Sequence, residues 1–433
     1  MILLLLGVLG LSPLFAYQSP DIVELSVQIS QDNVKEILTK LESFQTRHVL
    51  SSNKSNFGIR ASADWIHEKF TSLNPRLKVY FDSYELEPQG RMSKGYSLRN
   101  VVAVLPGRLT GENEQIFLLN AHYDSYARKE DDSSPRDSFD NFAPGVNDDG
   151  SGVAALIETA RVFSQNDFDA TLYFVAFAGE EVGLVGSTLM AARLKAEGKN
   201  VGGVLTLDMI GNIQGGNGVF DNKRIRVFSA GPADSASRQL ARYAKRVGEM
   251  YFPSAHVDCI YRADRFGRGG DHTPFVLEGW PGIRIMEASE NYSRQHTVHD
   301  TLDNMDLEYC TRNIRVVASI LASLASAPPA PSIISERGRP LLGRGDSGYA
   351  AQLKWNPVSS ENLKGYKVLW RKTTSPDWEK EVMVGNQTEY TLNDVSIDEY
   401  IFGVCAVDQN GNESLVSAYT MAPRSKRTYK IKE

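Results

Sequence analysis

The sequence predicts an α/β domain with a largely parallel sheet, followed by a small all-β domain. The chain of 433 residues is longer than one hydrophobic core usually serves. Before the proline cluster at residues 327–331, apolar runs with the length of buried strands alternate with segments of helical periodicity, as in α/β folds. After it, short alternating segments are separated by turn sequences, which is typical of a β-sandwich.

Apolar runs mark the candidate strands of the α/β domain. They cover residues 116–119, 171–178, 204–207, 225–228 and 282–286. Apolar residues recur at helical spacing over residues 153–163, and we expect Ser151 to cap this helix. A second apolar helix over residues 315–322 is expected to end before the proline cluster, because proline cannot continue a helix.

Composition divides the chain into segments. They are a signal peptide at residues 1–16, the α/β domain at 17–326, a proline-rich linker at 327–332, the all-β domain at 333–422 and a basic tail at 423–433. The apolar run at the N-terminus is shorter than the roughly 20 residues of a membrane helix and matches the core of a secretory signal. An uncleaved anchor is the alternative, because no Lys or Arg precedes the run. We therefore expect a secreted or periplasmic protein without a stable membrane span.

The charge and cysteine content narrow the classes of partner and site. The net charge is -6, and no basic face interleaved with aromatic residues occurs outside the tail, so we expect no nucleic-acid partner. None of the three cysteines has the C-x-x-C spacing of a thiolate metal site. Cys405 alternates with apolar residues and is expected to be buried, whereas a bridge between Cys259 and Cys310 is an open alternative.

Acidic and imidazole side chains follow the apolar runs or stand at the start of the helix between them. They are His122, Asp148, Glu180, Glu181, Asp208 and His296. Ligands bind at the carboxyl ends of the strands in open parallel sheets, so we expect these side chains to converge. Each of them alone is more often structural, but their joint occurrence predicts a metal site. Carboxylates and imidazoles without thiolate suit zinc, cobalt or manganese.

The six side chains together look like a site for two metals. Two metals about 3.5–4 Å apart need a shared ligand, and a carboxylate can bridge through its two oxygens. Asp148 is the bridging candidate, because the glycines around it allow a close approach of backbone and metal. Glu180 and Glu181 repel each other unless a metal neutralises one and the other handles protons. The predicted chemistry is hydrolysis by a metal-bridging water that Glu180 activates.

Five motifs carry a resemblance to a known family. They are residues 122–125 (HYDS), 145–152 (GVNDDGSG), 177–187 (FAGEEVGLVGS), 207–212 (LDMIGN) and 270–275 (GDHTPF). Together with residues 58–66 and 100–103, they make residues 35–325 resemble the M28 (aminopeptidase Y) family of metallopeptidases. The resemblance implies the zinc exopeptidase fold, which has three layers with a mixed, largely parallel sheet flanked by helices.

The resemblance implies a ligand set for two Zn²⁺ ions per chain. His122 and Asp208 would hold the first ion, Glu181 and His296 would hold the second, and Asp148 would bridge them. His299 is the alternative to His296, but the family spacing of four residues between His and Asp selects His296.

The resemblance also implies roles for residues that do not bind metal. Glu180 would be the general base and acid, and Asp124 would orient His122. Asp149 would support the ligands, and the peptide bond that joins it to Asp148 would be cis. Asp271 would be a further supporting carboxylate.

Two positions near the last ligand leave alternatives. Asp271 and His272 can also be interpreted as direct ligands, although the family pattern favours a supporting role. Gln295 stands where some relatives carry a tyrosine that assists the oxyanion. This task would then fall mainly to the metals, with Tyr292 or Arg268 as possible contributors.

The all-β domain resembles a fibronectin type III module. The pattern rests on Trp355, on the Gly365-Tyr366 strand and on the strand at residues 400–407, which precedes an Asn-Gly turn. The domain contains no histidine, so we expect it to bind another protein or a polysaccharide, or to act as a spacer, rather than to catalyse.

The leading hypothesis is a secreted zinc aminopeptidase that acts on peptides with a free N-terminus. A glutaminyl cyclase or a carboxypeptidase on the same scaffold is the enzymatic alternative, and cyclases of this fold generally use one zinc. A non-catalytic binding protein is a third hypothesis. It is disfavoured because such proteins typically lose ligands, whereas all five ligands and the base are present here.

Overall fold

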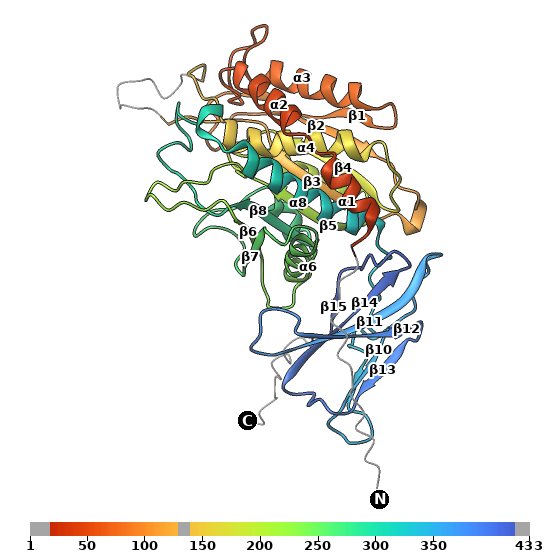
Figure 1. Ribbon diagram of the computed structural model, residues 1–433. Helices are drawn as coiled ribbons and strands as arrows, with labels where there is room; N and C mark the ends of the chain where they lie inside the picture. Colours follow the sequence, from red (N-terminus) through yellow and green to blue (C-terminus); the bar gives the residue numbers. More distant parts are fainter. Residues whose placement is uncertain (1–17, 129–138, 421–433) are drawn as a thin grey trace, which may run out of the picture.

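The structure is a computed structural model that describes residues 18–128 and 139–420 (Figure 1). The predicted signal peptide and basic tail lie outside these residues. The described chain forms an α/β part around one large sheet and an all-β part that follows it.

The large sheet is mixed and has a parallel centre. Its strand order is β1-β2-β4-β3-β5-β8-β6-β7. The bounds are β1 (Lys78–Leu86), β2 (Tyr96–Leu105), β3 (Ile116–His122), β4 (Thr171–Phe177), β5 (Val201–Leu207), β6 (Arg224–Ser229), β7 (His256–Ile260) and β8 (Gly282–Glu287). Strands β4, β3, β5 and β8 are parallel, whereas β2 joins β4 and β6 joins β8 in antiparallel pairs. The predicted fold class is confirmed.

All five predicted strands form, and their burial explains why they are visible in the sequence. Strands β3, β4 and β5 are buried along their whole length. A parallel strand covered on both faces has a nearly continuous apolar sequence. Strand β1 at one edge is only partly buried, and β7 at the other edge is short and partly buried, so neither has this signature.

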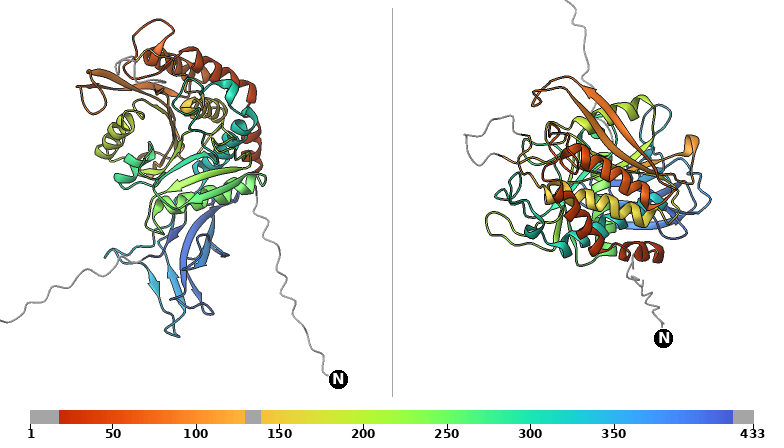
Figure 2. Two further views of the ribbon diagram at one scale, coloured as in Figure 1. Left: turned by 90° about the vertical axis from the view of Figure 1, so that its left-hand side faces the viewer. Right: turned by 90° about the horizontal axis from the view of Figure 1, so that it is seen from above.

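Helices cover both faces of the sheet (Figure 2). One apolar core is shared by α1 (Pro20–Val27), α2 (Gln31–Ser43), α3 (Gly58–Leu73), α4 (Ser151–Phe163), α6 (Ala236–Tyr251) and α8 (Leu307–Ser326). A second core contains α5 (Val185–Ala196) and α7 (His272–Leu277). This is the predicted arrangement of three layers. Helix α8 ends directly before the proline cluster, as predicted.

Helix α4 is the helix predicted at residues 153–163, but Ser151 does not cap it. The N-cap is Gly150, and no side chain caps the helix. The Ser151 hydroxyl instead donates to the carbonyl oxygen of Asn147 at 2.7 Å and accepts from the backbone N–H of Ile210 at 3.1 Å. Ser151 therefore joins the start of α4 to the segment that follows β5.

The all-β part consists of two facing sheets. One has the order β13-β10-β9 and the other β12-β11-β14-β15. The bounds are β9 (Leu342–Gly343), β10 (Ala351–Lys354), β11 (Leu363–Lys372), β12 (Lys380–Gly385), β13 (Glu389–Leu392), β14 (Tyr400–Asp408) and β15 (Ser417–Ala418). Leu353 of the first sheet shares one buried core with Tyr366 and Phe402 of the second. The predicted small β-sandwich is confirmed.

Ion pairs fasten the all-β part to α6 and the segment before it (Figure 1). The Arg371 guanidinium donates to both carboxylate oxygens of Asp234, at 2.7 and 2.9 Å, and these side chains are 3% and 10% exposed. On α6, Lys245 pairs with Asp377 at 2.7 Å. A largely buried, charge-assisted ion pair restricts how one part can move against the other.

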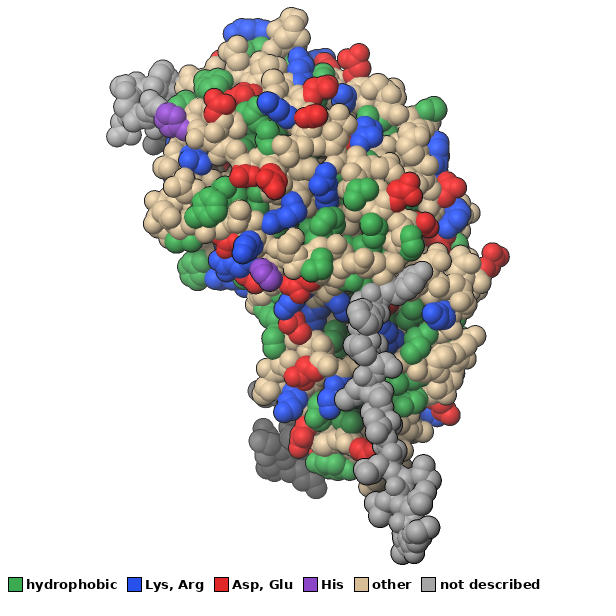
Figure 3. All heavy atoms as spheres, viewed as in Figure 1, with side chains coloured by type: hydrophobic (Ala, Val, Ile, Leu, Met, Phe, Trp, Pro, Cys, Tyr) green, Lys and Arg blue, Asp and Glu red, His purple; other side chains and the backbone are tan. Residues whose placement is uncertain are grey.

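Two further predictions concern the surface and the cysteines. No helix among residues 18–128 and 139–420 is long and apolar enough to cross a membrane. Acidic and basic side chains are interspersed on the face shown in Figure 3.

All three cysteines are free thiols, so the alternative of a bridge between Cys259 and Cys310 is not formed, and Cys405 is buried as predicted.

The Arg371→Ala variant tests the junction. Removing Arg371 takes two charge-assisted hydrogen bonds from Asp234, which keeps its pair with Arg242 at 3.3 Å, so the free energy of unfolding should fall by about 1.5–3 kcal/mol. Urea denaturation followed by tryptophan fluorescence measures this, because Trp355, Trp370 and Trp378 lie in the all-β part. The control is Lys354→Ala, which breaks an exposed pair and should cost less than about 1 kcal/mol. Equal losses in both variants would contradict the interpretation.

Candidate metal centre

The strand topology gathers the predicted ligands at one edge of the sheet. His122 is the last residue of β3, Glu181 follows β4, and Asp208 directly follows β5. Asp148 lies in the turn Val146–Gly150 before α4, and His296 lies in the loop after β8. Because β3, β4, β5 and β8 are parallel, their carboxyl ends meet at this edge.

The carboxylate of Asp148 lies between the two imidazoles. Its Oδ1 is 3.2 Å from His122 Nε2, and its Oδ2 is 3.1 Å from His296 Nε2. His296 Nε2 also lies 2.9 Å from Glu181 Oε1, and His122 Nε2 lies 3.9 Å from Asp208 Oδ1. Each oxygen of Asp148 thus belongs to a separate cluster of donor atoms.

The donor atoms are arranged as a metal would require. One ligand atom each from His122, Asp148 and Glu181 lies within 4.8 Å of the others. Both His122 Nε2 and Glu181 Oε1 are buried without a hydrogen-bond partner among the described residues. A buried polar atom left unsatisfied costs roughly 1–3 kcal/mol, and a bound cation removes that cost. The oxygen and nitrogen donors fit Zn²⁺.

The charges of the ligands depend on one another. Burial opposes ionisation of Asp148, but the imidazoles of His122 and His296 beside its two oxygens outweigh burial and hold its pKa well below the usual range. Burial raises the pKa of the half-buried Glu180 well above its usual value, against the effect of His122 and with an addition from Glu181. The site therefore contains one firmly ionised carboxylate between the imidazoles and one carboxyl that retains its proton more readily.

Asp124 contacts His122, as the resemblance implied, and also holds a second segment of the site. The closest partner of His122 Nδ1 is the carbonyl oxygen of Asp124 at 3.0 Å, while the carboxylate lies at 3.6 Å. The carboxylate oxygens instead accept the backbone N–H groups of Glu180 and Glu181, at 3.2 and 3.1 Å. Asp124 therefore fixes both the imidazole and the acidic loop after β4.

Asp149 ties three segments together. Its carboxylate accepts the backbone N–H groups of His122 at 3.2 Å, Met209 at 3.1 Å and Gly152 at 3.0 Å. A Cβ at Gly152 would lie 2.5 Å from this carboxylate, so only glycine fits there. The peptide bond between Asp148 and Asp149 is cis, as the resemblance predicted.

Asp271 is buried, but it is not part of the donor cluster. Neither of its carboxylate oxygens has a hydrogen-bond partner in the described part of the chain, and burial raises its pKa to about 7. His272 Nε2 lies 2.8 Å from the carbonyl oxygen of Ala263. The only metal-compatible group found in the described residues contains neither side chain, so their direct ligation gains no support.

The two candidate histidines for the last ligand differ in burial, and the neighbours of His296 have other partners. His299 is exposed, whereas His296 is buried against Asp148. Gln295 donates from Nε2 to Asp148 Oδ2 at 2.8 Å. The Tyr292 hydroxyl donates to Glu290.

Sequence reasoning missed three residues that hold the site. Asp300 accepts the backbone N–H groups of Asn147 and Asp148, both at 2.9 Å. The fully buried Arg47 donates to the carbonyl oxygens of Pro144 and Gly145. In the sequence Asp300 marks only the spacing that selects His296, and no local pattern marks Arg47, because the backbone groups that both residues hold are far away in the chain.

Arg284 is the third residue, and the sequence did contain a signal for it. The charged side chain interrupts the apolar run of β8 and is fully buried. It lies 2.6 Å from Asp208 Oδ2 and 2.9 Å from Asp264 Oδ1. A buried arginine needs acidic partners, so a cation within a predicted strand indicates a nearby carboxylate.

The comparisons with known proteins agree with this geometry. The model of peptidase family M28 matches residues 100–321. A probable zinc metalloprotease of Pyrenophora tritici-repentis is 34% identical over 91% of this chain and 96% of its own length.

Solved structures show the same fold. The LapA aminopeptidase of Legionella pneumophila covers 72% of this chain and 76% of its own, with a TM-score of 0.55 and 24% identity. A glutaminyl cyclase of Macrostomum lignano covers 71% and 92%, with a TM-score of 0.54 and 19% identity. At these identities the likeness concerns the fold.

Asp300→Asn tests the support of the donor cluster. An amide cannot accept both backbone N–H groups, so Asp148 should lose its fixed position and zinc affinity should fall about tenfold or more. Competition with a coloured chelator measures the affinity, and the exposed Asp303→Asn is the matched control. If both variants bind zinc like the unchanged protein, Asp300 does not position the ligands.

Proposed function

The chain belongs to peptidase family M28 of zinc metallopeptidases, and from this premise we propose that it is an aminopeptidase that uses two zinc ions. The observation that carries the proposal is the position of Asp148, whose two carboxylate oxygens face different imidazoles. The substrate is a peptide with a free N-terminus, since an acidic cluster attracts the N-terminal ammonium group.

The two donor clusters define the proposed ligand sets. His122, Asp208 and Asp148 would hold the first zinc, while Glu181, His296 and Asp148 would hold the second. When bound, the metals polarise the peptide carbonyl and activate water.

Glu180 is the proposed general base and acid. It is adjacent to Glu181 in the chain, and burial raises its pKa, so it can take a proton from the attacking water and return it to the leaving amine. Its backbone is fixed by Asp124, which limits how far the carboxyl can move. The Gln295 amide donates to Asp148, so oxyanion stabilisation would fall mainly to the bound metals.

Glutaminyl cyclase activity is the second candidate, because a cyclase shares the fold with a TM-score close to that of the aminopeptidase. Carboxypeptidase activity remains a third alternative on the same scaffold. A peptide panel with free and blocked ends separates the three: an aminopeptidase needs a free N-terminus, and a cyclase releases ammonia from N-terminal glutamine without shortening the chain.

We further propose that the protein is secreted and that its all-β part is a fibronectin type III-like module. The apolar residues 2–16 support secretion. The two facing sheets and their shared core support the module assignment. Its proposed role is to bind a protein or polysaccharide while it stays fastened to α6.

Glu180→Gln tests the proton transfer. Metals should remain bound, because Glu180 is not a proposed ligand, while turnover of an aminoacyl reporter should fall by roughly 10²- to 10⁴-fold. Steady-state kinetics and the zinc content of the same sample check both parts. Unchanged turnover would sink the proposed mechanism.

The number of zinc ions per chain can be tested in the unchanged protein and in a variant that lacks one ligand. The purified protein should contain two zinc ions per chain and lose peptidase activity when a chelator removes them. His296→Ala should retain about one ion, since the second cluster loses its imidazole. Elemental analysis measures the count, and the exposed His299→Ala is the control that should keep two. A single ion in the unchanged protein would argue for the cyclase instead.

A further inference from the structure

A depression of about 390 Å³ beside the metal centre has no role in the chemistry described above. Its lining combines arginines with exposed aromatic rings and includes Arg226, Arg262, Arg265, Arg268, Phe266 and Tyr292. We propose that this arginine pocket binds a carboxylate of the peptide substrate and makes the enzyme prefer peptides with an acidic group there. The proposal rests on the proposed peptidase function.

The arginine pocket borders the metal centre through two connections. Phe228 and Ile260 line it and pack with Met209, the residue directly after Asp208. On another side, Tyr292 lies four residues before His296 in the same loop. The arginine pocket therefore adjoins the segments that carry Asp208 and His296.

The charge of the arginine pocket is strongly positive. Four arginines line it against one glutamate. Glu290 is shared between Arg226, at 2.9 Å, and Arg265, so it is already neutralised. Pockets lined by one sign of charge concentrate ligands of the opposite sign.

Two of the arginines are available for a ligand. Arg262 and Arg268 are exposed, and neither guanidinium has an ion pair or hydrogen bond to another described residue. The guanidinium carbon of Arg262 lies over the Phe266 ring, 5.5 Å from its centroid. A guanidinium pairs with a carboxylate through two parallel hydrogen bonds, which favours a carboxylate over an uncharged group.

The aromatic rings provide contact for the rest of the ligand. Phe266 is 88% exposed, the highest value among the exposed large apolar side chains of the described residues, and Tyr292 is 53% exposed. Exposed aromatic side chains grouped with arginines are common at binding sites, where they supply contact area. The ligand is therefore an acidic group on an organic chain, as in a peptide.

Matched peptide pairs identify which carboxylate is bound. The first pair differs by Glu or Met at the N-terminus, where glutamine is avoided because a cyclase would consume it. The second differs by Glu or Gln at position two, and the third by a free or amidated C-terminus. The ratio of kcat/KM within each pair should exceed about tenfold for at least one pair, as one charge-assisted hydrogen bond allows.

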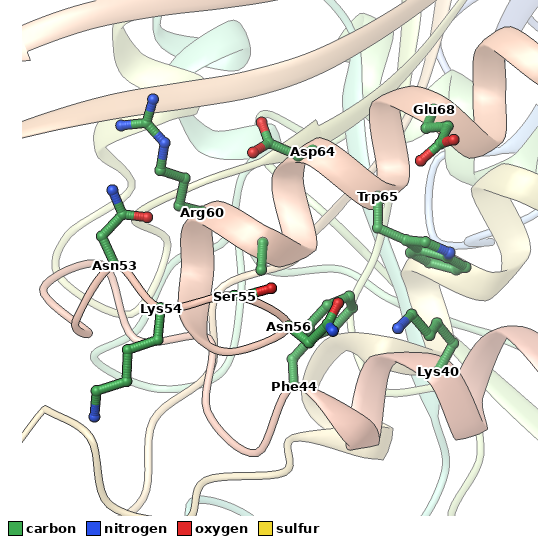
Figure 4. Close-up of a pocket in the computed structure, with 11 residues that line it drawn as sticks. Lys40, Phe44, Asn53, Lys54, Ser55, Asn56, Arg60, Asp64, Trp65 and Glu68 are labelled. Carbon is green, nitrogen blue, oxygen red and sulfur yellow. The ribbon is translucent and has the colours of Figure 1, made fainter.

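Substitution of the two free arginines tests the cause of that ratio. In the double variant Arg262→Gln/Arg268→Gln the ratio should fall toward one. The control is Arg60→Gln, an exposed arginine that lines a different pocket between α2 and α3 (Figure 4), and it should leave the ratio unchanged. Ratios near one in the unchanged protein, or a ratio that survives in the double variant, overturn the proposal.

A binding measurement separates failure of this proposal from failure of the peptidase proposal. Cleavage of the uncharged peptides with ratios near one leaves the peptidase standing and removes the arginine pocket. If no peptide is cleaved, the peptidase proposal fails, and calorimetric titration of zinc-loaded Glu180→Gln protein with the same pairs decides. Tighter binding of the acidic peptide, lost in the arginine double variant, supports the pocket, and equal binding overturns it.

Discussion

The carboxylate of Asp148 lies between two imidazoles that are far apart in the sequence, and the geometry of the metal centre depends on it. One oxygen lies 3.2 Å from His122 and the other 3.1 Å from His296. A side chain in this position has to be held firmly, because a shift of its oxygens would separate the two donor clusters. Much of the surrounding structure serves this purpose: Asp300 accepts its backbone N–H, and Arg47 fixes the preceding turn.

Burial of the ligands increases the electrostatic repulsion between their carboxylates. Several carboxylates share a space from which water is largely excluded, where like charges raise each other's pKa. The protein offsets part of this repulsion with the imidazoles and with Arg284, which contacts Asp208. A bound cation would offset more of it, and the unpaired buried atoms His122 Nε2 and Glu181 Oε1 are the donors that such a cation would satisfy.

The ligand positions and the central strands could be predicted from sequence, because both are local. A buried parallel strand has a continuous apolar run, and a polar residue directly after it stands at the functional edge. Supporting residues were harder to predict, since Asp300 and Arg47 act on backbone groups that lie far away in the chain. The role of Asp124 was predicted only in part, because its carboxylate binds the loop after β4.

The central claim is that Asp148 bridges two zinc ions, and crystals of the zinc-loaded protein test it most directly. Anomalous diffraction at the zinc absorption edge should show two peaks about 3.5–4 Å apart, with one oxygen of Asp148 next to each. A single peak, or two peaks of which only one contacts Asp148, would contradict the account.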